Sequence, residues 1–138
     1  MSYLVDTNVI SELRKGPRAD QGVTDWLASV NDFELFLSAL TVGELRQGIE
    51  RIRSRDRVSA VHLERWLHGI VTSFEDRILP VDAQVADAWG RLNAAKQTPV
   101  VDGLLAATAQ VRDLTLVTRN IKDVQRTGVR CLDPFTGH

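Results

Sequence analysis

The sequence is poor in the residues that build disulfide scaffolds and membrane spans. A single cysteine, Cys131, stands among 138 residues, which excludes an internal disulfide framework and favours a reducing compartment. No uncharged run approaches the roughly 18 apolar residues of a membrane helix, so we expect no membrane contact. The first residues show no basic and apolar leader, and we therefore expect a cytoplasmic protein.

An excess of charge of either sign is also missing. The chain has 17 Lys and Arg residues against 18 Asp and Glu residues, which excludes a strongly basic nucleic-acid coat and an acidic tail. One local exception lies at residues 46–57, where five arginines outnumber Glu50 and Asp56. This segment is either a solvated helix end or a rim that contacts phosphate, since arginine favours bidentate phosphate contacts.

Short apolar runs alternate along the chain with stretches of helical periodicity. The runs predict strands at residues 3–5, 34–38, 78–81, 114–118 and 128–132. The periodic stretches predict helices at residues 7–13, 23–30, 41–52, 58–74, 82–96 and 104–111. Strands separated by helices predict an α/β fold with a mainly parallel sheet of about five strands flanked by helices. With no linker or repeat in view, we expect a single domain over residues 1–138.

Four polar positions stand where strands end or helices begin. Asp6 follows the first strand, Asn120 follows the strand at 114–118, and Glu44 and Asp102 lie near helix starts. Each has a structural explanation by itself. Asp6 and Asp102 could cap helices, Glu44 could close a capping box with Thr41, and Asn120 is a common turn residue.

The joint placement of these residues favours a functional explanation. In an open parallel sheet, ligand sites lie beyond the carboxyl ends of the strands, where we expect Asp6, Glu44 and Asp102 to gather. Three neighbouring carboxylates repel one another by several kcal/mol even at an effective dielectric near 20. A hard cation would relieve this repulsion, and oxygen ligands select Mg²⁺ or Mn²⁺ over zinc.

At these positions the sequence resembles a known family. The resemblance rests on five ordered blocks, which are residues 4–13 (LVDTNVISEL), 40–48 (LTVGELRQG), 101–109 (VDGLLAATA), 116–120 (LVTRN) and 132–135 (LDPF). In this order they resemble the signatures of PIN-domain ribonucleases, and in particular the toxin subunits called VapC in their FitB-like branch. The blocks extend over essentially the whole chain.

The resemblance implies a PIN-like fold, a divalent metal site and endonucleolytic cleavage of RNA. By position, Asp6, Glu44 and Asp102 match the acidic site residues of the family. Asp6 and Asp102 would be direct metal ligands, with Glu44 binding through water or positioning the attacking water. Asn120 stands where the family often has an aspartate, which is a departure. Asp123, three residues on, is a candidate for the missing charge, so the number of metal ions stays open.

The implied reaction and partners follow from the same resemblance. Mg²⁺-activated water would hydrolyse the phosphodiester and leave a 5′ phosphate, without a catalytic histidine. We expect Arg46 and Arg119 to contact the RNA. The resemblance also implies a homodimer, and a VapB/FitA-type antitoxin that covers the acidic site, builds a higher assembly and contacts DNA through its own domain.

Four other functions fit parts of the pattern. A HAD-type phosphohydrolase needs a second aspartate where Asn8 stands, and a receiver domain needs a lysine where the chain has Arg119. Zinc enzymes need Cys or His sets that the sequence lacks. The stronger alternative is a weakly catalytic binding module that acts mainly as a co-repressor with its antitoxin on DNA, since Asn120 supplies no charge.

Overall fold

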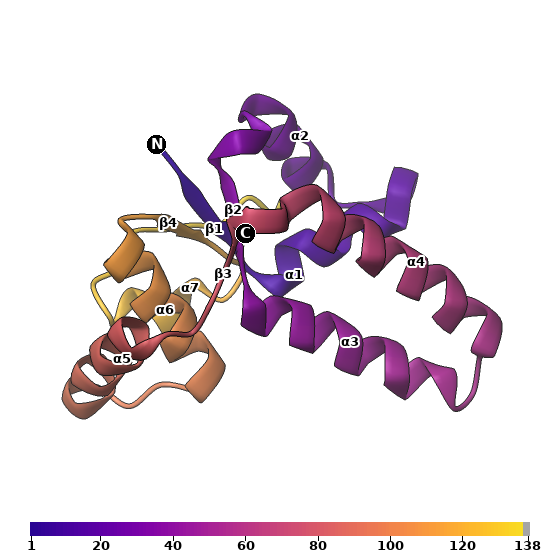
Figure 1. The fold of residues 1–138 in the computed structure, drawn as a ribbon. Coiled ribbons are helices and arrows are strands. Elements are labelled where there is room, and N and C mark those ends of the chain that lie inside the picture. Colours follow the sequence, from indigo (N-terminus) through magenta and orange to yellow (C-terminus); the bar gives the residue numbers. More distant parts are fainter. Residues whose placement is uncertain (137–138) are drawn as a thin grey trace.

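A five-stranded sheet forms the centre of the molecule in the computed structural model, which describes residues 1–136 (Figure 1). The strands are β1 (Tyr3–Val5), β2 (Leu35–Ser38), β3 (Ile78–Leu79), β4 (Thr115–Val117) and β5 (Cys131–Leu132). Their order is β3-β2-β1-β4-β5, and all four pairings are parallel. The predicted α/β fold is confirmed, although β3 and β5 are shorter than the sequence indicated. Residues 137–138, the end of the predicted domain, lie outside the described residues.

Helices connect the strands at nearly all the predicted places. They are α1 (Thr7–Ile10), α2 (Gln21–Ser29), α3 (Ala39–Arg53), α4 (Arg57–Phe74), α5 (Ala83–Ala95), α6 (Val100–Arg112) and α7 (Ile121–Gln125), with 3₁₀ turns at Ser11–Arg18, Asp32–Glu34 and Glu75–Arg77. Asp82 caps α5 as expected, because its Oδ1 accepts the Val85 N–H at 2.9 Å. Within residues 1–136, no helix is both long and apolar enough to cross a membrane.

The two faces of the sheet are covered by different helices (Figure 1). Along β1, Val5 faces a core built with α1, α2, α3 and α4, whereas Leu4 faces a core built with α6 and α7. This alternation is the period of two that a strand buried on both faces requires. The pair α3 and α4 forms a long antiparallel hairpin on the first side, and α5 packs against α6 on the second.

The order of the strands reverses between β1 and β4. From β1 the chain moves through β2 to β3 on one side, then crosses to β4 and β5 on the other. Ligands bind at such reversals of strand order in open α/β sheets. Asp6 and Thr118 are the residues that directly follow these two strands.

Helices α3 and α6 begin earlier than the sequence patterns predicted. Helix α3 starts at Ala39 because Ser38 is its N-cap, with Oγ accepting the Leu40 N–H at 3.0 Å. The capping box that Thr41 and Glu44 could have formed is therefore absent at this helix start, and Thr41 is buried. Helix α6 starts at Val100, so Asp102 lies inside the first turn and is not the N-cap.

Candidate active site

Asp6 is a buried carboxylate held by three neighbours. It caps α1 with Oδ1, which accepts the Thr7 N–H at 2.7 Å. Its Oδ2 accepts the Thr118 hydroxyl at 2.7 Å and the Asn8 amide at 3.3 Å. Burial raises the pKa of Asp6 despite these hydrogen bonds, which act in the opposite direction. The capping role and the site role expected for Asp6 are thus compatible, because capping uses one of its two oxygens.

Asp102 shows that the predicted acids share one region. Its pKa rises to about 6, first because the carboxyl is partly buried and then because of the charges of Asp6, Asp123 and Glu44. The charges of Asp6 after β1, Glu44 in α3 and Asp123 in α7 therefore act on Asp102 in α6. Asp6 and Glu44 are 38 positions apart in sequence, and only the fold brings them near Asp102.

Glu44 is joined to Asp6 through Thr7. The Thr7 hydroxyl donates to Glu44 Oε1 at 2.6 Å, while the Thr7 N–H donates to Asp6. This is a contact between the N-terminal turn of α1 and the second turn of α3. One threonine thus fixes the orientation of two acids.

Asn120 and Asp123 lie at the start of α7. The Asn120 N–H donates to the Thr118 hydroxyl at 3.0 Å, and the Asn120 side chain makes no capping hydrogen bond. Asn120 is exposed. Asp123, one of the acids that raise the pKa of Asp102, stands in the first turn of the same helix. The charge absent at Asn120 is therefore present one turn further along α7.

The two arginines expected to contact RNA have different surroundings. Arg46 donates to Glu50 at 3.2 Å and to Glu64 at 2.7 Å, in a network on the α3–α4 hairpin that also includes Arg53. Its charge is thus already paired. Arg119 is exposed and forms no ion pair with an acid in the described part of the chain.

Three polar residues of the site were missed by sequence reasoning. Thr7, Asn8 and Thr118 hold the acids, although Thr7 and Thr118 resemble ordinary residues at the ends of strands. Their position in the sequence could have identified them, since each follows β1 or β4 by one to three residues, at the reversal of strand order. Thr118 is fully buried with its hydroxyl directed at Asp6.

The donor set fits a hard divalent cation. Its members are carboxylate, amide and hydroxyl oxygens, and the raised pKa of Asp102 shows that negative charge is concentrated there. Within residues 1–136, no three Asp, Glu, His or Cys side chains are grouped closely enough to form a complete ligand set by themselves. Mg²⁺ needs fewer protein ligands, because it keeps several waters and binds through one or two carboxylates.

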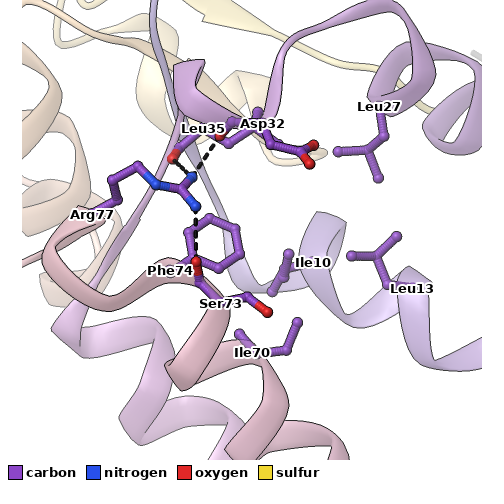
Figure 2. A pocket seen from close by; sticks show the side chains of 9 residues that line it. All are labelled: Ile10, Leu13, Leu27, Asp32, Leu35, Ile70, Ser73, Phe74 and Arg77. Atoms are coloured by element: carbon purple, nitrogen blue, oxygen red, sulfur yellow. Dashed lines mark hydrogen bonds between the residues drawn. The ribbon is translucent and has the colours of Figure 1, made fainter.

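An apolar cleft of about 330 Å³ lies elsewhere on the molecule (Figure 2). Arg77 borders it and donates to the carbonyl oxygens of Asp32 and Leu35. The remaining lining residues are Ile10, Leu13, Leu27, Ile70, Ser73 and Phe74. None of the predicted site residues lines this cleft, so it is separate from the acidic cluster.

Known proteins share both the sequence pattern and the fold. The family model described as PIN domain matches residues 3–128. The chain belongs to the PIN-domain family. This PIN domain is 34% identical to Toxin FitB of Neisseria gonorrhoeae over 96% of this chain and 97% of that protein. It is 30% identical to VapC ribonuclease Y4jK of Sinorhizobium fredii, with 96% of each chain covered.

A solved complex agrees with this assignment. The structure of FitAB bound to an IR36 DNA fragment contains a chain 32% identical to this PIN domain, with a TM-score of 0.84 over 99% of this chain and 97% of that one. The resemblance to FitB-like VapC toxins drawn from the motifs is therefore confirmed, and so is the PIN-like fold.

Proposed function

We propose that this PIN domain is the toxin of a type II toxin–antitoxin module and acts as a Mg²⁺-dependent endoribonuclease. The observation that carries the proposal is the effect of Asp6, Glu44 and Asp123 on the pKa of Asp102. Carboxylates gathered at the reversal of strand order are what a divalent cation and a phosphodiester require. Relatives named VapC ribonuclease and tRNA(fMet)-specific endonuclease VapC support the reaction class.

In the proposed site each acid has its own role. Asp6 and Asp102 hold the cation, and Thr118 and Thr7 keep Asp6 oriented for it. A Mg²⁺ or Mn²⁺ ion held by these residues would polarise the phosphate and lower the pKa of water. Glu44, steadied by the Thr7 hydroxyl, orients the attacking water.

Two further residues complete the proposed site, and they bear on the number of cations. Asn120 contributes an amide oxygen without charge, and Asp123 contributes the charge that Asn120 lacks.

In the proposed reaction, water attacks phosphorus and the bond to the 3′ oxygen breaks, so the products carry a 5′ phosphate and a 3′ hydroxyl. No 2′-hydroxyl takes part in this step.

We infer a cognate VapB/FitA-type antitoxin as the partner. The similarity to FitB in a FitAB complex on DNA supports this inference, and the antitoxin would supply the DNA contact. A homodimer of this chain and a higher assembly with the antitoxin belong to the same proposal. The apolar cleft beside Leu13, which is 42% exposed, offers a surface that such a partner could cover.

A second candidate function is favoured by Asn120. An amide where the family often has an aspartate weakens the attraction for a cation, so the chain would act mainly as a co-repressor within the antitoxin–DNA complex. Under this alternative, the partner-free protein cleaves RNA poorly but raises the affinity of its antitoxin for operator DNA.

The decisive experiment measures cleavage of end-labelled RNA by the partner-free protein with and without Mg²⁺. We expect Asp6→Asn and Asp102→Asn to reduce the rate by at least about a hundredfold, because metal assistance contributes several kcal/mol to such reactions. Asp87→Asn is the matched control, since Asp87 is exposed and pairs with Arg91 on α5. If either site variant cleaved RNA at the rate of the unsubstituted protein, the proposal would be overturned. If the unsubstituted protein raised the affinity of the antitoxin for DNA without cleaving RNA, the co-repressor function would be favoured.

A further inference from the structure

Arg119 lies beside the acidic cluster but does not pair with it. It directly follows Thr118, whose hydroxyl donates to Asp6. Its guanidinium carbon lies 4.7 Å from the centre of the Phe135 ring, and the side chain is exposed. Among residues 1–136, no acid forms an ion pair with Arg119. The aromatic ring, and not a carboxylate, is therefore the partner of this guanidinium.

The ring itself is held firmly. Phe135 is only 4% exposed, and its N–H donates to Asp133 Oδ1 at 2.9 Å. The next residue, Thr136, donates its N–H and its hydroxyl to the Asp20 carboxylate at 3.1 and 2.7 Å. Asp20 is the N-cap of α2. The segment that carries Phe135, near the carboxyl end of the chain, is thus hydrogen-bonded to the start of α2, near the amino end.

The backbone of Arg119 is fixed next to the proposed metal ligands. Its N–H donates to Asn8 Oδ1 at 3.2 Å, and the Asn8 amide nitrogen donates to Asp6 Oδ2 at 3.3 Å. Arg119 is therefore anchored at its backbone through Asn8 and at its head by Phe135. A side chain held at both ends loses little further freedom when it binds.

Stacking on a ring leaves the hydrogen-bonding edge of arginine available. A guanidinium over an aromatic face interacts through its plane, whereas its five N–H donors lie in that plane. The same stacking opposes an ion pair between Arg119 and Asp6, which would put a fixed positive charge where a cation is proposed to bind. The fork of donors matches the geometry of a phosphate group.

We propose that Arg119 contacts a backbone phosphate of the RNA next to the scissile one, and that Phe135 is the positioning residue that holds its guanidinium ready. This inference rests on the proposed function and names how the same site grips its substrate. A phosphate contact of this kind carries no sequence information and sets the register of the strand. Phe135 touches Arg119 and not the RNA.

The test is a double-mutant cycle with Arg119→Ala, Phe135→Leu and the double variant. The first readout is the affinity for a short labelled RNA hairpin in EDTA, over a series of salt concentrations. The second is the KM and kcat for its cleavage in Mg²⁺. Arg130→Ala is the matched control, because Arg130 pairs with Asp113 at the amino end of the strands, away from the acids.

We expect Arg119→Ala to weaken RNA binding and raise KM about tenfold with little change in kcat, the effect of losing one charge-assisted hydrogen bond. The slope of log affinity against log salt should fall by about 0.7 to 0.9, the value for one phosphate contact. Phe135→Leu should raise KM about threefold. In the Arg119→Ala background, Phe135→Leu should not raise KM further. If Phe135 had only a structural role, it would raise KM in both backgrounds. Arg119→Lys should restore part of the affinity.

Each of the other possible results shows which part of the proposal is wrong. If the wild-type protein cuts RNA and Arg119→Ala binds and cuts equally well, the phosphate contact is wrong while the proposed function stands. If Arg119→Ala loses only antitoxin affinity, the partner is a protein carboxylate and the proposal is again wrong. If Phe135→Leu has the same effect with and without Arg119, the positioning role is wrong. A wild-type protein that neither binds nor cuts RNA overturns the proposed function and this inference together.

Discussion

At the scale of single residues, the candidate site depends on hydroxyl groups that keep buried carboxylates in place. Asp6 is 6% exposed and accepts hydrogen bonds from Thr7, Asn8 and Thr118. Burial of a carboxylate is costly, and each such hydrogen bond offsets part of that cost. The threonines are as much a part of the site as the acids they hold.

The Thr118 hydroxyl provides a direct test of this dependence. We expect Thr118→Val, which keeps the shape of the side chain, to lower the free energy of unfolding at neutral pH by about 2 kcal/mol. The pKa of Asp6 should rise further, so activity should be lost at a higher pH on the acid side. Urea unfolding and a pH–rate profile measure the two effects.

Thr108 is the control for this prediction. Its hydroxyl is also fully buried, but it donates to the carbonyl oxygen of Leu104 within α6 and not to a carboxylate. Thr108→Val should cost less than about 1 kcal/mol and leave the pH–rate profile unchanged. Equal effects of the two substitutions would show that Asp6 does not depend on Thr118.

At the scale of elements, the start of α2 is clamped by the segment that follows β5. The backbone of α2 at Gly22 approaches the Pro134 carbonyl oxygen and Thr136 so closely that a Cβ there would collide with them. Asp20, which caps α2, also accepts the N–H and hydroxyl of Thr136. This clamp fixes the Phe135 ring and hence the position proposed for Arg119.

Two glycines in helices should therefore respond to alanine in opposite ways. Gly22→Ala should destabilise the protein by about 1–3 kcal/mol, because the methyl group displaces the segment at Pro134. Gly69→Ala in α4 should stabilise it by about 0.5–1 kcal/mol, because its Cβ meets open space. Thermal unfolding of both variants is the measurement, and a stabilised Gly22→Ala protein would contradict the clamp.

The starts of α5 and α3 differ in how well the local sequence predicts them. The cap of α5 at Asp82 followed from its place after an apolar run. Thr41 and Glu44 fit a capping box equally well, yet the cap of α3 is Ser38, the last residue of the predicted strand. Helix α3 follows β2 directly, so Thr41 lies buried inside its first turn.

At the scale of the whole molecule, the acidic cluster is a source of electrostatic strain. Burial of the carboxyl, and after it the charges of Asp6, Asp123 and Glu44, raise the pKa of Asp102 from 3.8 to about 6. A carboxyl whose pKa is higher in the folded protein binds more protons there than in the unfolded chain. The stability of the metal-free protein should therefore fall as the pH rises from about 4 to about 6, and stay low above that range.

Removal of this charge should stabilise the metal-free protein while destroying its activity. At pH 8 in EDTA, Asp102→Asn should raise the free energy of unfolding by about 1–2 kcal/mol, less than the full shift implies because the group is partly exposed. At pH 4 the difference should vanish. Mg²⁺ should raise the melting temperature of the wild type at pH 8 by a few degrees, and that of Asp102→Asn much less.

Asp87→Asn is again the matched control, because Asp87 is exposed on α5. It should show neither the gain in EDTA nor the loss of the Mg²⁺ response. An Asp102→Asn protein as sensitive to pH and Mg²⁺ as the wild type would show that the four acids do not act together.

The sequence by itself determined the class of fold and the family, and it marked four acidic or amide positions as candidates for the site. Apolar runs and helical periods are local properties, and Asp6, Glu44, Asp102 and Asn120 lie in ordered motifs that can be recognised along the chain. The order of the strands, the hydroxyl groups that hold the acids, and the stacking of Arg119 on Phe135 were decided only by tertiary structure. The reason is that these are contacts between residues far apart in sequence, and no local pattern records which distant segments pack together.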